Sequence, residues 1–169
     1  MLSRRENGMK LPATIEPENV TAIVDTREQT PLDLSPLRTI GGTLDTGDYS
    51  IQGLEHVVRV ERKSLPDLLG CVGRERDRFE REVQRLLAYP VRVLVVESTW
   101  QALEVGGWRG SVSPSQVIGS LLGWQAAGLS VHCACDHHRA ARHVSRLLYT
   151  IAKRKYRELR SLVEYEVEV

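Results

Sequence analysis

The string VVRVERKSLPD, residues 57–67, indicates how the chain is built. Its first part is rich in β-branched residues, as strands are, and its second part opens with Ser64, which is typical of a helix N-cap when Asp67 stands three positions later. Residues 56–63 are therefore expected to form a strand that leads into a helix. In that strand Glu61 and Lys63 share one face because side chains alternate with period two.

Strands and helices are expected on both sides of this string. Apolar or β-rich runs predict further strands over residues 20–25, 43–44, 49–51, 91–96 and 129–133. Helical spacing of apolar residues predicts helices over residues 74–89, 100–105, 113–128 and a long final segment capped by Asp136. Prolines and glycines in residues 29–42 predict a loop. The pattern indicates a single α/β domain with a central sheet flanked by helices, and leaves the topology open.

One constellation of charged residues is suited to chemistry. Asp48 follows Gly47, and a hairpin back to Glu61 would bring the two carboxylates together with Lys63, while Asp25 ends the first apolar strand. Paired carboxylates repel each other unless a cation lies between them, and Mg²⁺ prefers such oxygen ligands. A lysine beside them could hold a water or stabilise a phosphoryl transition state. The pattern is compatible with a divalent-metal phosphodiesterase.

Each of these residues also has a structural interpretation. Residues 61–63 could be solvated charges of an edge strand, Gly47-Asp48 is an ordinary turn pair, and Asp67 suits the first turn of a helix. Spacing alone does not decide between the two interpretations, and the structural one is the commoner.

A resemblance favours the functional interpretation. The pattern Gly47-Asp48, a spacer, then ERKSLPD at residues 61–67, with DTRE at residues 25–28, resembles the nuclease domain of the XPF-type structure-specific endonucleases. The small-residue segment that ends in Gly73-Arg74 is also similar, and the resemblance covers about residues 22–152. It implies a restriction-nuclease-like fold with a mixed central sheet and Mg²⁺- or Mn²⁺-dependent cleavage of DNA, branched DNA being the expected substrate in repair or recombination.

The resemblance also implies roles for single residues. Asp25, Asp48 and Glu61 would be metal ligands, and Lys63 would assist the nucleophile or the transition state. Arg62 matches a position needed for activity, and it should point away from Lys63, so a salt bridge with Asp67, another matching position, is favoured. Supporting or DNA-binding roles are implied for Arg27, Glu28 and Arg74.

The resembled family usually carries a tandem helix-hairpin-helix module after the nuclease domain, and the 169 residues leave no room for it. A separate DNA-binding partner is therefore one alternative, and a phage or mobile-element nuclease with little structure preference is another. A catalytically silent scaffold is the rival of a different class. A symmetric homodimer through the C-terminal helices is expected, because those helices carry more apolar surface than one small domain needs.

Charge is uneven along the chain although the net charge is only +1. Residues 16–48 carry a net charge of -5 and residues 137–160 a net charge of +7, which fits a metal site beside a surface for a polyanion. Three cysteines favour a reducing, intracellular compartment, and no signal peptide or apolar run long enough to span a membrane is found.

Domain boundaries are expected as a flexible arm over residues 1–19, the nuclease domain over residues 20–160 and a tail over residues 161–169. Trp108 and Arg109, in a glycine-flanked loop, are candidates for a wedge that contacts DNA. The string HCACDHH, residues 132–138, lacks the spacing of common structural zinc sites, so Cys133 is expected to face the core and Asp136 to cap a helix.

Overall fold

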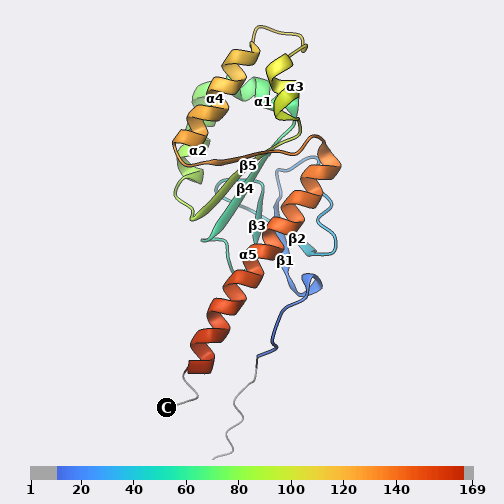
Figure 1. The fold of residues 1–169 in the computed structure, drawn as a ribbon, viewed down its shortest axis with the longest axis vertical. Helices are drawn as coiled ribbons and strands as arrows, with labels where there is room; N and C mark the ends of the chain where they lie inside the picture. The colour runs from blue at the N-terminus through green and yellow to red at the C-terminus, as the bar shows by residue number, and fades with distance from the viewer. Residues whose placement is uncertain (1–10, 166–169) are drawn as a thin grey trace, which may run out of the picture.

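A mixed sheet of six strands lies at the centre of the structure (Figure 1), and the computed structural model describes residues 11–165. The strand order is β2-β1-β3-β4-β5-β6. β1 pairs antiparallel with β3, and β3 pairs antiparallel with β4, whereas the pairs β1–β2, β4–β5 and β5–β6 are parallel. The strands are β1 (Thr21–Asp25), β2 (Arg38–Gly42), β3 (Tyr49–Ile51), β4 (Val58–Lys63), β5 (Val91–Val96) and β6 (Ser130–Cys133). The expected mixed central sheet is confirmed.

Helices cover both faces of this sheet and bury a separate apolar cluster on each. β5 shows why, because its side chains alternate: Val93 and Val95 pack in the cluster under α5, and Leu94 and Val96 pack in the cluster under α1, α2 and α4. The helices are α1 (Leu65–Val72), α2 (Arg76–Leu86), α3 (Trp100–Val105), α4 (Pro114–Ala126) and α5 (His137–Tyr165), with a 3₁₀ turn at Pro17–Asn19.

Helix ends follow from local chemistry. Ser64 caps α1 and accepts a hydrogen bond from the amide of Asp67 at 3.3 Å, as its position predicts. Ser113 and Gln116 form a capping box at the start of α4. Asp136 Oδ1 accepts from the amide of Arg139 at 2.7 Å, which confirms it as the cap of α5.

Several expected boundaries are corrected. Residues 38–42, expected in a loop, form the edge strand β2, and residues 43–44 form no strand. β2 is mostly exposed and is held by its pairing with β1. Its sequence therefore lacks the alternation of apolar and polar residues that would predict a strand. The helix expected over residues 74–89 is shorter, at Arg76–Leu86, because α1 and a turn precede it.

The two ends of the domain also differ from expectation where the structure describes them. Residues 1–10 of the expected arm lie outside the described residues, but the carbonyls of Pro12 and Ile15 accept hydrogen bonds from Tyr156 and Tyr149 of α5 at 2.7 and 2.9 Å. The arm is thus attached to α5 from residue 12 on. α5 runs into the expected tail as far as Tyr165, and residues 166–169 lie outside the described residues. Within the described part of the chain, no helix is both long and apolar enough to cross a bilayer.

Candidate active site

Strand pairing brings three carboxylates side by side at one end of the sheet. Tyr49 of β3 lies opposite Val60 of β4. The next pair outward is Asp48 and Glu61, since the amide of Asp48 donates to the carbonyl of Val60 at 2.8 Å. The amide of Asp25 donates to the carbonyl of Asp48 at 2.8 Å, which extends the arrangement to β1. Directly opposed residues have Cβ atoms about 4.5–5.5 Å apart and share a face. We call Asp25, Asp48 and Glu61 the acidic row.

Gly47 permits the turn that delivers Asp48. Its φ is +76°, in the left-handed region that favours glycine, and a Cβ there would lie 3.2 Å from the carbonyl oxygen of Val60. Any larger residue would push the turn away from β4 and thereby displace Asp48. Steric constraints at the turn therefore explain why a glycine precedes Asp48 in the sequence motif.

The surroundings of Asp48 and Glu61 raise the pKa of both carboxyl groups above their usual values. Burial raises the pKa of Asp48 from 3.8 to about 6, although the amide of Arg62 donates to its Oδ2 at 2.7 Å. Burial and then the charge of Asp48 raise the pKa of Glu61 from 4.5 to about 7. Among residues 11–165, no donor bonds to Asp48 Oδ1 or Glu61 Oε2. A cation bound to these free oxygens would therefore stabilise the ionised form of both carboxylates.

Lys63 lies beside the acidic row on the same face of β4. Its Nζ forms an ion pair with Glu61 Oε1 and lies 5.2 Å from the centre of the Phe79 ring. Burial alone would lower the pKa of this ammonium group, but the charge of Glu61, its hydrogen bond and the neighbouring acidic groups together outweigh burial, and the pKa is raised. Lys63 is a stable cation, suited to stabilising negative charge rather than to accepting a proton.

Asp25 is held differently from its two neighbours. Its Oδ1 accepts from the Nε of Arg27 at 2.8 Å and from the amide of Arg27 at 2.9 Å, and its Oδ2 accepts from the amide of Leu44 at 2.7 Å. The bonds to Arg27 lower the pKa of Asp25 to about 2, against the effect of burial. Asp25 is therefore ionised, with both oxygens occupied by donors. The Arg27 side chain is itself 68% exposed at the mouth of the site.

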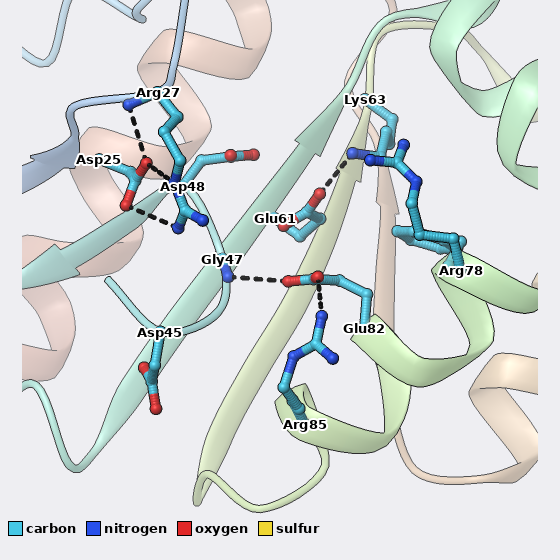
Figure 2. A pocket seen from close by; sticks show the side chains of 11 residues that line it. Asp25, Arg27, Asp45, Gly47, Asp48, Glu61, Lys63, Arg78, Glu82 and Arg85 are labelled. Atoms are coloured by element: carbon cyan, nitrogen blue, oxygen red, sulfur yellow. Dashed lines mark hydrogen bonds and ion pairs between the residues drawn. The ribbon is translucent and has the colours of Figure 1, made fainter. Parts of the chain in front are cut away.

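A pocket of about 260 Å³ opens over the acidic row, between β4 and α2 (Figure 2). From α2, Glu82 reaches across to accept from Thr46 Oγ1 at 2.5 Å and from the amide of Gly47 at 3.3 Å. Glu82 therefore ties the turn before Asp48 to the helix. The pocket is lined by Asp25, Arg27, Asp45, Gly47, Asp48, Glu61, Lys63, Arg78, Phe79, Glu82 and Arg85.

Sequence reasoning missed the contribution of α2. Arg78, Glu82 and Arg85 recur at spacings of four and three and so lie along one side of the helix, next to Phe79. The helical spacing of apolar residues that predicts this helix belongs to the adjoining apolar stripe, where Phe79 and Val83 are buried. The signal was the charged edge of that stripe, which has meaning only once α2 is known to lie over β4.

Arg62 faces away from the acidic row, as alternation predicts, but the favoured salt bridge with Asp67 is wrong. Arg62 binds Glu28 at 2.9 Å and Glu97 at 2.8 Å, and its side chain is 9% exposed. Asp67 is exposed and accepts from the hydroxyl of Ser64 at 2.6 Å. The reason is geometric: the chain turns into α1 after Lys63, which carries Asp67 away from the buried face.

The remaining candidates lie outside the pocket. Arg74 is 85% exposed and pairs with Glu75 at 3.8 Å. Trp108 donates from Nε1 to the carbonyl of Val112 at 2.7 Å and packs against the cluster under α4, so it has a packing role, and the wedge that contacts DNA stays a prediction. Arg109 is exposed in the same loop.

The residues of the string 132–138 have separate roles. Cys133 is half-buried in β6 against the cluster under α4, as expected. His132 stacks on His143 of α5, with ring centres 3.5 Å apart. His137 Nδ1 lies 2.7 Å from Glu97 Oε1 and so joins the cluster around Arg62.

A divalent cation fits two members of the acidic row. In residues 11–165 no three or more His, Cys, Asp or Glu side chains are grouped to hold a metal ion. Mg²⁺, however, usually keeps several waters and binds one or two carboxylates together with substrate phosphates. Asp48 and Glu61, each with an oxygen that lacks a donor and with a raised pKa, are the residues that would hold such an ion.

Comparisons with known proteins agree with this fold. The ERCC4 domain matches residues 24–147. The structure is similar to XPF from Aeropyrum pernix, with 22% identity and a TM-score of 0.62 over 76% of this chain and 59% of that chain. It is also similar to XPF from Aeropyrum pernix in complex with DNA, with 20% identity and a TM-score of 0.62 over 80% of this chain and 66% of that chain. The chain thus spans less than two thirds of either structure. None of the curated protein sequences matches it.

Proposed function

Since the chain belongs to the ERCC4 domain family, we propose that it is a metal-dependent endodeoxyribonuclease that hydrolyses phosphodiester bonds in branched DNA. The observation that carries the proposal is the arrangement of Asp48, Glu61 and Lys63 on one face at the floor of one pocket. Two carboxylates with raised pKa values beside a fixed lysine form a site for a phosphate and its cation. Mg²⁺ and Mn²⁺ both suit these oxygen ligands.

Each residue of the pocket has a proposed role that depends on its position. A divalent cation held by Asp48 and Glu61 would supply Lewis-acid activation of the phosphate and of an attacking water. Lys63 would stabilise the charge that develops on the phosphoryl oxygens, because its ammonium group is held at the pocket by Glu61. Arg27, exposed at the mouth, is placed to bind a neighbouring phosphate.

Two further groups hold this arrangement in place. The amide of Arg62 fixes one oxygen of Asp48, while its guanidinium clamps Glu28 and Glu97 on the other face of the sheet. Glu82 fixes the turn before Asp48 from α2. A shift of about 1 Å in a catalytic group costs about a hundredfold in rate, so these contacts would support activity without touching substrate.

The test is cleavage of labelled flap, fork, three-way and linear DNA with Mg²⁺ or Mn²⁺, comparing the wild type with Asp48→Asn. We expect metal-dependent cutting of branched DNA that Asp48→Asn abolishes. Cutting of linear duplex at the same rate would support the phage or mobile-element alternative. Absence of cutting on all four substrates would contradict a self-sufficient nuclease and leave a scaffold, or a nuclease that needs a DNA-binding partner.

We further propose a homodimer through the C-terminal helices. Leu122 of α4 and Leu159 and Leu162 of α5 are 51%, 52% and 69% exposed, and a partner chain would remove these apolar side chains from water. Light scattering should give twice the monomer mass for the wild type and the monomer mass for Leu122→Asp/Leu159→Asp. An intracellular location rests on DNA being the substrate.

A further inference from the structure

α5 carries a line of basic side chains along its solvent side. Six residues follow one another at spacings of three, four or seven, which places them on one face of a helix. The opposite face, which includes Ala140, Val144, Leu148 and Ala152, is buried against the sheet. We call the six residues the basic stripe: Arg139, Arg142, Arg146, Lys153, Arg157 and Arg160.

Three cations of the stripe have no acidic partner in the part of the chain that the structure describes. Among residues 11–165, no acidic group lies within salt-bridge distance of Arg142, Arg146 or Arg157. Glu158, the acid closest in sequence, pairs instead with Arg154 and Lys155, which lie off the stripe. Exposed cations such as Arg142, Arg146 and Arg157, with no acid within that distance among the described residues, are costly for the isolated domain and mark a surface for an anion.

The surface around Arg142 and Arg146 is also hollowed. A groove of about 410 Å³ runs beside them and is lined by Arg139, Arg142, His143, Arg146, Leu147 and Thr150. Burial lowers the pKa of His143, so this residue is neutral at pH 7. The groove thus offers arginine donors and one threonine hydroxyl with no carboxylate among its lining residues.

The basic stripe is separate from the acidic row. α5 packs over the face of the sheet that holds Val60 and Val95, whereas Glu61 and Lys63 lie on the face that α2 covers. Figure 1 shows α5 crossing the sheet and continuing beyond it. An anion bound along α5 would therefore not be the phosphate under attack.

We propose that the basic stripe binds the phosphate backbone of duplex DNA, as a contact distinct from the catalytic pocket. The ligand follows from the proposed function, and the surface follows from the structure. Arg139 to Arg160 spans about 32 Å at 1.5 Å per residue, which is close to the length of nine base pairs. A membrane surface is disfavoured because the apolar side chains of α5 from Ala140 to Ala152, on the face that an interfacial helix would insert, pack against the sheet. A second basic stripe is disfavoured as the occupant because like charges would meet across a symmetric interface, whereas the proposed dimer uses Leu159 and Leu162 on the other side of α5.

The test is fluorescence anisotropy of a labelled 20-base-pair duplex, in EDTA so that no cutting occurs, over a series of salt concentrations. Arg142→Gln/Arg146→Gln removes two charges from the stripe. Arg38→Gln/Arg81→Gln is the matched control, since it removes two exposed arginines of β2 and α2 and changes the net charge equally. Thermal unfolding should be the same for all three proteins, because each of the four arginines is exposed.

The expected loss follows from counterion release. Each phosphate contact contributes a slope of about 0.9 in the salt dependence of log K, so two contacts are worth about 60-fold in affinity at about 0.1 M salt. The stripe variant should bind about 60-fold more weakly with a slope reduced by about 1.8, and the control should change less than about 2-fold.

Equal losses in the two variants would overturn the proposal, since binding would then follow net charge alone. Unchanged affinity in the stripe variant would overturn it too and leave an acidic protein as the partner of α5. Cleavage of DNA by the wild type in the presence of Mg²⁺ is measured in a separate assay. If the stripe variant loses affinity but the wild type cuts no DNA, the proposed nuclease activity is refuted, while the proposal that the basic stripe binds DNA stands.

Discussion

Replacing Asp48 by Asn should abolish cutting and, in the absence of metal, make the protein more stable. Asp48 is forced to carry its charge in a buried position beside Glu61, so the metal-free folded state pays for that charge at neutral pH. Asn has nearly the same shape, and its side-chain oxygen still accepts from the amide of Arg62. The substitution therefore removes the charge and keeps the hydrogen bond.

The size of the effect follows from the pKa. A rise from 3.8 to about 6 corresponds to about 3 kcal/mol at pH 8, at 1.36 kcal/mol per pH unit. The folded state binds the Asp48 proton more tightly than the unfolded state, so this group lowers stability as pH rises from about 4 to about 6. For a domain of this size, about 3 kcal/mol corresponds to a rise in Tm of about 6–12 °C.

The assay is thermal unfolding of wild type and Asp48→Asn in EDTA at pH 4 and pH 8. The variant should be the more stable at pH 8, and the difference should shrink at pH 4. Added Mg²⁺ should raise the Tm of the wild type and leave that of the variant unchanged. Asp67→Asn is the control, an exposed carboxylate outside the pocket, and should lower stability slightly. A variant that is equally or less stable than the wild type at pH 8 would refute the repulsion argument.

Three more predictions concern neighbouring residues. Lys63→Met should slow single-turnover cutting by about 10²–10³ because it removes the cation beside the transferred phosphate, and Lys63→Arg should restore part of the rate; equal rates for all three proteins would contradict its role. Arg62→Met should lower the free energy of unfolding in urea by about 3–5 kcal/mol, since it leaves Glu28 and Glu97 buried without their cation; a loss below 1 kcal/mol would show that the clamp is dispensable. Asp25 has a pKa lowered to about 2, so its contribution is present above about pH 4 and lost toward pH 2. Asp25→Asn should therefore flatten the acid limb of a stability titration followed by circular dichroism, and an unchanged limb would count against the bonds to Arg27.

Local patterns in the sequence predicted those features that depend on neighbours in the chain. The alternation of residues 58–63 placed Glu61 and Lys63 together and Arg62 opposite, and the structure confirms both. Ser64 and Asp136 were recognisable as caps because a cap depends on the next three residues only. The hairpin from Asp48 to Glu61 was also foreseen, since two antiparallel strands close in sequence fix their own register.

Features that depend on packing between distant segments were not predictable. The partners of Arg62, Glu28 and Glu97, lie 34 and 35 positions away in sequence and are brought to it by strand order. Glu82 reaches the turn before Asp48 only because α2 packs over β4. The packing of Trp108 against the cluster under α4 is another example, since glycines flank it in sequence and predict only a loop. No local pattern records which face of the sheet a helix covers.

The motif residues Glu61, Arg62 and Lys63 show why a contiguous string can serve two purposes. Because a strand alternates, Glu61 and Lys63 line the pocket while Arg62 clamps two acids on the opposite face. The two faces are connected through one peptide unit, since the amide of Arg62 holds Asp48 in the acidic row. The ion pairs of Arg62 on one face of the sheet therefore help to fix the position of the Asp48 carboxylate on the other face. Exchanging the two cations, as in Arg62→Lys/Lys63→Arg, keeps net charge but would lose the bidentate clamp, so it should impair both folding and cutting.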